Sequence, residues 1–307
     1  MRITGVGGKL RFGVLGVVIQ LVVLLSAMAG CSPGGNIQGP YFREVLLQGE
    51  GKSKIVLIDI YGPISNQPMM IPNIGTVPGM TGRIRQELEL AYEDRDVRAV
   101  LLRINSPGGT LTDSDIIYHS IVEFKKSKKV KVIASLGDIA ASGAVYIAMA
   151  ADEIIAHPTT ITGSIGVILP FTEYAGLMEK LGITTDPVTS GQFKDIDSPY
   201  RKRTKEEKKM LQELVDAQHQ QFVNVIRTGR KHMSRKEVEA LADGRIFSAQ
   251  VAKEKGLIDD IGYLDDAYKR LQKISGHASS RLVRYANAWA TGNNIYSSAF
   301  PVEIGGQ

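Results

Sequence analysis

A serine surrounded by small residues is the first candidate for chemistry in this sequence. Ser142 follows a predicted strand, stands at the start of a predicted helix and is flanked by Ala141 and Gly143. Backbone N–H groups at a helix N-terminus have no intrahelical partner, and the helix dipole favours negative charge there. Ser142 is therefore a candidate nucleophile for a reaction with an anionic transition state. The alternative is that Ser142 only caps the helix.

Two adjacent glycines form a second candidate element at the end of another predicted strand. Gly108 and Gly109 close the segment Ser106-Pro107-Gly108-Gly109. Because glycine has no Cβ, its backbone N–H can point at a ligand without obstruction by a side chain. Such donors could hold an oxyanion or a phosphate. A simple tight turn is the alternative interpretation.

A lysine could supply the base that a serine nucleophile needs. Lys194 is the only lysine between Lys180 and Lys202, and it follows the turn-forming pair Ser190-Gly191. Free lysine has a pKa of about 10.4, but burial disfavours the ammonium form and leaves an amine that can activate a hydroxyl. Taken alone, a lysine in such a turn is usually solvated.

A histidine base is the competing interpretation. His157 lies 15 residues beyond Ser142, after a strand in the same region, so a Ser–His–acid set is conceivable. His157 also precedes Pro158 at a strand exit, where a surface role is ordinary. No His/Asp/Glu spacing indicates a metal site, and no cofactor is expected.

Strands and helices alternate through the middle of the chain, and this pattern positions the candidates. Apolar runs predict strands at 54–60, 99–104, 130–136, 153–156 and 165–169, and helical spacing predicts helices from Thr81 and at 112–126, 142–151 and 172–181. Such alternation implies an α/β fold with a largely parallel sheet.

Helices alone are predicted after Thr204. Thr204 with Glu207, and Ser234 with Glu237, match the capping-box pattern, and further helices are predicted at 248–255 and 264–274. The C-terminal part is therefore expected to be helical.

The first 31 residues have the parts of a secretory signal or a membrane anchor. Three basic residues precede an apolar stretch, 12–25, and small residues follow up to Cys31, the only cysteine. A lipoprotein signal with lipidation at Cys31, an uncleaved anchor helix and a plain cleaved signal are all open. Each places the rest of the chain outside the cytoplasm. We predict a signal or anchor at 1–31, a tether at 32–52, one domain at 53–275 and a tail at 276–307.

The charge distribution argues against a nucleic-acid partner. The formal net charge is +5, and three of these charges lie in the N-terminal segment, which contains no acid. The remainder is too small for an electrostatic footprint on phosphates. A single cysteine also excludes an intrachain disulfide.

Taken together and in order, the motifs resemble the signal peptide peptidase A family of serine peptidases (S49), in its short, single-repeat form. They are Ser-Pro-Gly-Gly at 106–109, Ala-Ser-Gly at 141–143, Thr-Gly-Ser-Ile-Gly-Val at 162–167 and Ser-Gly-x-x-Lys-Asp-x-x-Ser-Pro at 190–199. The resemblance implies a Clp protease/crotonase-like fold of repeated strand–helix units with a helical C-terminal part.

The resemblance also assigns roles to residues. It makes Ser142 the nucleophile and Lys194 the general base, gives the Gly109 N–H to the oxyanion with Gly108 beside it, and makes Ser164 the hydroxyl that holds the lysine amine. The Ser142 N–H is expected as the second oxyanion donor. Two departures are Ala144 and Asp197, where the family commonly has glycine. Ala144 could narrow the site, and an Asp197 facing the lysine would keep the amine charged.

The implied function is a membrane-tethered serine endopeptidase of the bacterial cell envelope, with its catalytic domain on the extracytoplasmic (periplasmic) side. The implied substrates are remnant signal peptides and other membrane-associated or unfolded segments, and the implied assembly is a homo-oligomeric ring. Two other classes remain open: a crotonase-like acyl-CoA enzyme and a non-enzymatic membrane scaffold. Because coenzyme A is cytoplasmic, the secretory N-terminus argues against the acyl-CoA enzyme.

Overall fold

The computed structural model describes residues 42–71, 75–287 and 294–296. Chain contacts divide the protein into two units, 1–41 and 42–307, and all described residues belong to the second. The predictions for Cys31 and the N-terminal segment therefore lie outside the described residues.

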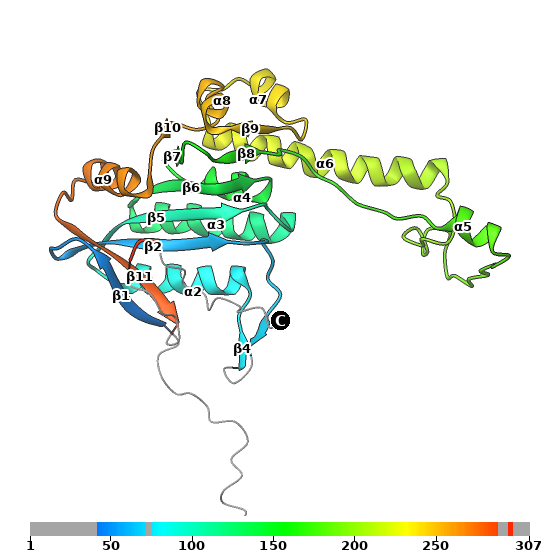
Figure 1. Ribbon diagram of the computed structural model, residues 1–307, viewed down its shortest axis with the longest axis horizontal. Helices are drawn as coiled ribbons and strands as arrows, with labels where there is room; N and C mark the ends of the chain where they lie inside the picture. Colours follow the sequence, from blue (N-terminus) through cyan, green and yellow to red (C-terminus); the bar gives the residue numbers. More distant parts are fainter. Residues whose placement is uncertain (1–41, 72–74, 288–293, 297–307) are drawn as a thin grey trace, which may run out of the picture. The chain divides into compact units, whose positions relative to one another are not determined.

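The second unit is built around one mixed sheet (Figure 1). Its central strands are parallel and follow the order β11-β2-β5-β6-β7-β10, while β1 pairs antiparallel with β11 at one edge. These strands are β1 (Phe42–Gln48), β2 (Ser53–Tyr61), β5 (Val97–Ser106), β6 (Lys131–Ala141), β7 (Glu153–Ala156), β10 (Asp260–Ile261) and β11 (Ser280–Asn287). Outside this path, β8 (Ile161–Gly163) pairs with the end of β6 and with β9 (Ile246–Ser248), and β3 (Met69–Ile71) pairs with β4 (Gly75–Val77).

Both faces of the central strands are covered, as their nearly continuous apolar sequences require. Alternate residues of β2 enter two different cores: Val56 and Ile58 face one, and Ile55 and Leu57 face the other. The larger core is closed by α2 (Met80–Glu93), α3 (Leu111–Lys128) and α4 (Gly143–Ala148), and the smaller by α9 (Leu264–Ser275). The α/β prediction is confirmed.

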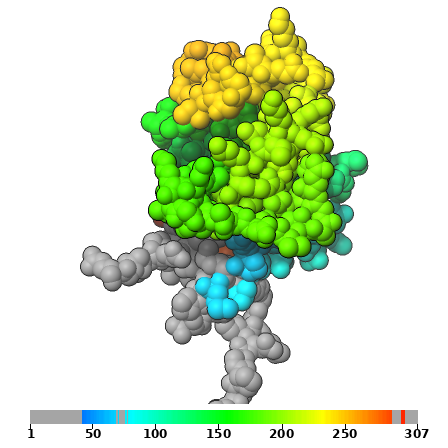
Figure 2. Space-filling view, turned by 90° about the vertical axis from the view of Figure 1, so that its right-hand side faces the viewer, coloured from blue at the N-terminus to red at the C-terminus, as the bar shows by residue number. Residues whose placement is uncertain are grey.

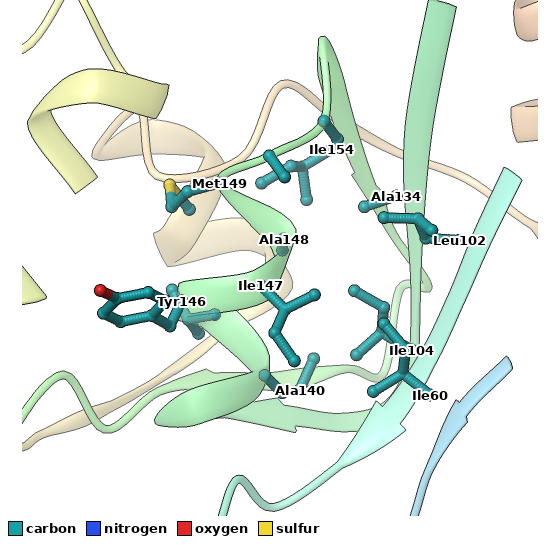
Figure 3. Packing of buried hydrophobic residues seen from close by; sticks show 14 of the residues in the cluster. Ile60, Leu102, Ile104, Ala134, Ala140, Tyr146, Ile147, Ala148, Met149 and Ile154 are labelled. Carbon is teal, nitrogen blue, oxygen red and sulfur yellow. The ribbon is translucent and has the colours of Figure 1, made fainter. Parts of the chain in front are cut away.

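Helix α4 is short, yet all six of its residues are buried. Figure 3 shows Ile147 pointing toward Ile104 and Ile60 on the sheet, while Tyr146 points to the opposite side of the helix. The helix thus lies between the sheet and the helices α3 and α6 (Lys205–Gly229). This packing fixes the position of the residue that precedes it, Ser142.

An arm extends from the sheet and consists of the segment 164–204 and the first half of α6. Figure 1 shows α5 (Ala175–Lys180) at the far end of this arm, and Figure 2 looks at the arm end-on, with its green and yellow-green residues in front. Only the C-terminal part of α6 enters the core, through Phe222, Val223, Val225 and Ile226. The shorter α7 (Arg235–Leu241) and α8 (Ala249–Glu254) follow α6.

Three predictions about elements were wrong. Residues 42–48, predicted as part of the tether, and 280–287, predicted as part of the tail, are β1 and β11, so the sheet extends beyond the predicted domain at both ends. The C-terminal part is not purely helical, because β9, β10 and β11 lie in it. No strand forms at 165–169, since the positive φ angles of Gly163 and Ser164 turn the chain out of the sheet.

Within the described residues, no helix combines the length and the apolar character needed to cross a bilayer.

Candidate active site

Ser142 occupies a strained turn between β6 and α4. Its φ is 54° and its ψ is −121°, a conformation that costs a non-glycine residue about 1–3 kcal/mol. Ser142 N–H donates to the Gly163 carbonyl over 2.9 Å, and the Ser142 carbonyl accepts from Tyr146 N–H over 3.1 Å. A serine on a strained strand-to-helix turn is the arrangement that presents a nucleophilic hydroxyl at the edge of a sheet. Ser142 makes no side-chain capping hydrogen bond, so the helix-cap interpretation fails.

The Gly108-Gly109 turn lies directly against Ser142. A Cβ on Gly108 would stand 2.8 Å from the Ser142 Cβ, and Gly108 has a φ of 101°, so both space and backbone require glycine. The turn is held from two sides: Gly108 N–H donates to Ser106 Oγ over 3.1 Å, and its carbonyl accepts from Ile64 N–H over 2.9 Å. The two glycines predicted from sequence therefore belong to the site.

Two backbone N–H groups are available for an oxyanion, but one differs from the prediction. Ser142 N–H is occupied by the Gly163 carbonyl. Gly143 N–H, by contrast, is the first of α4 and has no partner within the helix. A Cβ on Gly143 would lie 3.4 Å from Gly109 N, which places Gly143 and Gly109 side by side. The helix start directly after Ser142 was the sequence signal for Gly143.

The backbone of Gly163, the residue before Ser164, contacts Ser142. Gly163 pairs with Ala141 in the β8–β6 ladder and accepts the Ser142 N–H. Ser164 itself has a φ of 51°, and its N–H donates to the Arg245 carbonyl over 2.7 Å. The third motif of the sequence thus meets the second at Ser142.

Lys194 is not brought to Ser142 within the chain. It is exposed on the arm, in a turn closed by its own N–H to the Gly191 carbonyl. Gln192 in that turn donates to Glu206 near the start of α6, whereas Gln221, farther along α6, contacts Tyr146 beside the nucleophile. At 1.5 Å per residue, about 22 Å of helix separates these two contacts. Figure 1 shows the same separation between α4 and α5.

An ion-pair cluster organises the arm around the lysine turn. The Arg201 guanidinium binds both Asp195, at 2.7 Å, and Glu207, whose side chain is 2% exposed. Hydrogen bonds from Arg201 and from the Thr204 N–H hold the pKa of Glu207 down to about 2. Arg203 makes two further contacts that hold the arm together. It donates a hydrogen bond to the Ile196 carbonyl, and its guanidinium carbon lies 4.0 Å from the centre of the Phe171 ring. These contacts therefore fix the conformation of the turn, although the Lys194 side chain is exposed to solvent.

The remaining sequence candidates do not enter the site. His157 bonds to Thr159 and packs edge-on against Tyr263, and it lines a separate cavity of about 340 Å³ with Asp138. Ala144 is fully buried in the larger core. Asp197 is exposed and forms no ion pair with Lys194 in the described part of the chain.

Comparisons with known proteins assign the family. The model of peptidase family S49 matches residues 124–277. A protein of Enterococcus faecium named for signal peptide peptidase SppA is 37% identical over 246 residues, which are 80% of this chain and 70% of the relative. Protease 4 of Haemophilus influenzae is 31% identical over 279 residues, but the chain spans only 44% of that protein. Among solved structures, a point mutant of ClpP1 from Listeria monocytogenes aligns with 69% of this chain and 93% of its own, at 18% identity and a TM-score of 0.43.

The chain belongs to peptidase family S49. Its class is therefore that of the serine peptidases, and the resemblance drawn from the four sequence motifs is confirmed.

Proposed function

We propose that this protein is a membrane-tethered serine endopeptidase that uses Ser142 as nucleophile and Lys194 as general base. The observation that carries the proposal is the strained turn at Ser142, which faces the N–H groups of Gly109 and Gly143. A tetrahedral oxyanion between these two donors would lie within reach of the Ser142 hydroxyl. One such donor is worth about 3–4 kcal/mol of transition-state stabilisation.

Each half of the reaction moves one proton twice, to the Lys194 amine and then away from it. The neutral amine of Lys194 takes the proton of the Ser142 hydroxyl as its oxygen attacks the peptide carbonyl. The resulting ammonium gives that proton to the leaving amine, and an acyl-enzyme forms. Water then attacks the ester with the same amine as base, and Ser142 regains its proton as the carboxylic product leaves.

A second copy of the chain supplies the lysine in this proposal. Because Lys194 stands on the arm and the arm leads away from Ser142, a neighbouring protomer is the source of an amine for each site. Large apolar side chains are exposed along the same arm, among them Ile168 at 79% and Val188 at 100%. Their burial against a neighbour would drive assembly. A repeated head-to-tail contact closes into a ring when the rotation between neighbours divides a full turn, and such a ring is the assembly that we propose.

Docking into a neighbour would also prepare the lysine chemically. An ammonium is disfavoured where water is excluded, so burial against the partner's site converts the amine into a base. In this proposal the hydroxyl of Ser164, the residue after the Gly163 whose carbonyl binds Ser142, accepts a hydrogen bond from the arriving amine. An unassembled chain would therefore be inactive.

The substrates that we propose are remnant signal peptides and other membrane-associated or unfolded segments. The relative named for signal peptide peptidase SppA supports signal peptides as substrates, and the relative named Protease 4 supports a peptidase activity. The basic-then-apolar N-terminus ending at Cys31 supports attachment to the bacterial membrane with the catalytic domain on the extracytoplasmic side. Apolar peptides leaving the bilayer would then meet the site directly.

Peptide hydrolysis by the full chain in a neutral detergent tests this function. Ser142→Ala and Lys194→Ala should each lose activity. When the two variants are coexpressed in equal amounts, sites formed between protomers should recover about a quarter of wild-type activity, since each needs one intact residue from each side. No recovery would contradict the shared site, and full activity of Lys194→Ala would remove the lysine from the mechanism.

A further inference from the structure

A basic cleft of about 730 Å³ lies at the edge of the sheet where β5 and β6 begin. Among the residues that the structure describes, no acidic one lines it. Its walls are Arg95, Val97, Arg98, Lys128, Lys129, Val130, Lys131, Ile274, Ser275 and His277. Clefts of a few hundred to a thousand Å³ are the size that holds small ligands. The strand β6 has 11 residues, so this edge is about 33 Å from the edge that carries Ser142.

Helix stability explains only part of this charge. Lys128 donates to the carbonyls of Tyr92 and Asp94, at 2.6 and 2.7 Å, and so satisfies the end of α2. Cations near a helix C-terminus are also favoured by its dipole. Arg98 and Lys131 do not lie in helices, however, because they belong to the first residues of β5 and β6. Another explanation is needed for them.

Each acid near the cleft forms an ion pair with a lysine that does not line it. Asp94 binds Lys54 at 2.7 Å, and burial of Asp94, which opposes the effect, is outweighed by Lys54, so that the pKa of Asp94 is lowered. Asp96 faces Lys52 at 3.8 Å. The third, Asp152, lies 3.6 Å from Lys125.

The cations that line the cleft have few acidic partners. Asp152 is also 3.8 Å from Lys131. Across the residues that the structure describes, Arg95, Arg98 and Lys129 form no ion pair. The cleft therefore carries uncompensated positive charge.

The cations of the cleft also act on one another. Burial lowers the pKa of Lys128, and the nearby Arg98 lowers it further, against the opposing effect of Asp94. Arg98 and Lys128 thus repel each other in the folded chain. A cleft lined by charges of one sign attracts ions of the opposite sign.

We propose that this cleft binds a ligand that carries phosphate groups. Arginine presents a planar fork of donors to phosphate oxygens, and lysine adds point charge without a geometric demand. Two arginines and three lysines around one cleft match several phosphate charges better than a single carboxylate. The phosphates can belong to the headgroup of an anionic lipid or to a soluble polyphosphate. The site does not depend on the proposed peptidase function, because the cleft and Ser142 lie at opposite ends of β6.

Titration calorimetry with inorganic tripolyphosphate tests the site, with the full chain in neutral detergent at low salt. The test variant combines Arg95→Gln, Arg98→Gln and Lys129→Asn, the last chosen because Lys129 has a φ of 56° that asparagine tolerates. The control combines Lys231→Gln, Lys236→Gln and Lys255→Gln, three exposed lysines elsewhere, and changes the net charge equally. We expect wild type and control to bind alike and the test variant to bind at least about tenfold more weakly. Equal binding by all three proteins, or no binding by wild type, would overturn the proposal.

Thermal unfolding without ligand separates a binding role from a structural one. If Arg98 is present for a ligand, the test variant loses repulsion and should unfold at or above the wild-type temperature. A clearly lower unfolding temperature than the control would show that the cations stabilise the fold and would count against the site.

The two sources of phosphate can be told apart with lipid-doped micelles. If phosphatidylglycerol, but not phosphatidylcholine, weakens tripolyphosphate binding to wild type, the ligand is a lipid headgroup. If neither lipid competes while tripolyphosphate still binds, the ligand is soluble. Either outcome supports phosphate binding in the cleft.

Discussion

The hydroxyl of Tyr146 donates a hydrogen bond of 2.5 Å to Oδ1 of Asp115. This contact joins α4, which begins directly after Ser142, to α3, which begins just after the Gly108-Gly109 turn. Burial and the bond to Asp115 both raise the pKa of Tyr146, so its hydroxyl remains a donor throughout the neutral range. The two helices whose N-termini form the site are thus fastened to each other.

Tyr146→Phe should therefore disturb the site as well as the fold. A hydrogen bond to a charged group contributes about 1.5–3 kcal/mol, and its loss frees α4 to shift relative to α3. We expect lower stability in urea and a fall in kcat with little change in KM. Tyr118→Phe is the control, since Tyr118 packs edge-on against the Tyr146 ring but bonds no partner through its hydroxyl in the described contacts. An equal fall in kcat for both variants would contradict the positioning role.

Gly108→Ala should abolish peptidase activity. The new Cβ would stand 2.8 Å from the Ser142 Cβ and 2.9 Å from Gly143 N, so it would displace the nucleophile or an oxyanion donor. Gly62→Ala is the matched control, because Gly62 also has a positive φ, of 76°, but its added Cβ would meet no atom within 4 Å. Both variants should lose stability through backbone strain, while only the first should lose kcat. An active Gly108→Ala enzyme would remove this turn from the site.

Arg201→Gln should lower activity without destabilising the sheet domain. Loss of the guanidinium leaves Asp195 and Glu207 without their shared partner, so the turn that carries Lys194 loses its anchor. We expect kcat to fall at least about tenfold, as for a misplaced catalytic group, with an unchanged unfolding temperature. Arg270→Gln removes a comparable bidentate ion pair with Glu153, away from the arm, and should leave kcat unchanged. Wild-type kcat in Arg201→Gln would contradict the prediction.

Glu87 should make stability depend on pH. It is buried beside Arg83, at 2.6 Å, and burial raises its pKa to about 7 although Arg83 opposes this. The folded state then binds more protons than the unfolded state between about pH 4.5 and pH 7, so Glu87 lowers stability as pH rises through this window. The full effect is about 3 kcal/mol.

The variant Glu87→Gln does not titrate and isolates this contribution. Its stability in urea, subtracted from that of wild type, should change by about 2–3 kcal/mol between pH 5 and pH 8, in favour of the variant at the higher pH. Glu89→Gln, on the exposed side of the same helix, should show a constant difference. A constant difference for Glu87→Gln as well would show that the carboxyl titrates normally.

Local patterns in the sequence were enough to find the candidate nucleophile, Ser142, and the glycines that lie beside it. Ser142 and Gly108 lie where a strand ends and a helix starts. The residues that end the strand and begin the helix are within a few positions of each of them, so the pattern is visible in a short stretch of sequence. The capping boxes at Thr204 and Ser234 were confirmed for the same reason. The central parallel strands followed from their nearly continuous apolar runs.

Features that depend on distant partners were missed. The strands β1 and β11 pair with each other across more than two hundred residues, and the half-exposed sequence of β1 carries no strong period. Likewise, nothing near Lys194 in the sequence shows that it lies far from Ser142. That distance depends on the two ends of the long helix α6, because one end contacts the Lys194 turn and the other packs beside Ser142. The occupied Ser142 N–H also depended on a distant residue, the Gly163 carbonyl.

The half-exposed helix α6 has a consequence for the life of a newly made chain. If the outer half of α6 and the lysine turn form an active site only with a neighbouring protomer, the fraction of active protein rises with concentration. The total peptidase activity then rises more steeply than the amount of protein. A newly made molecule at low concentration would not cut the unfolded chains around it, and cutting would begin once enough copies had assembled. The concentration of the protein would then control whether it is active.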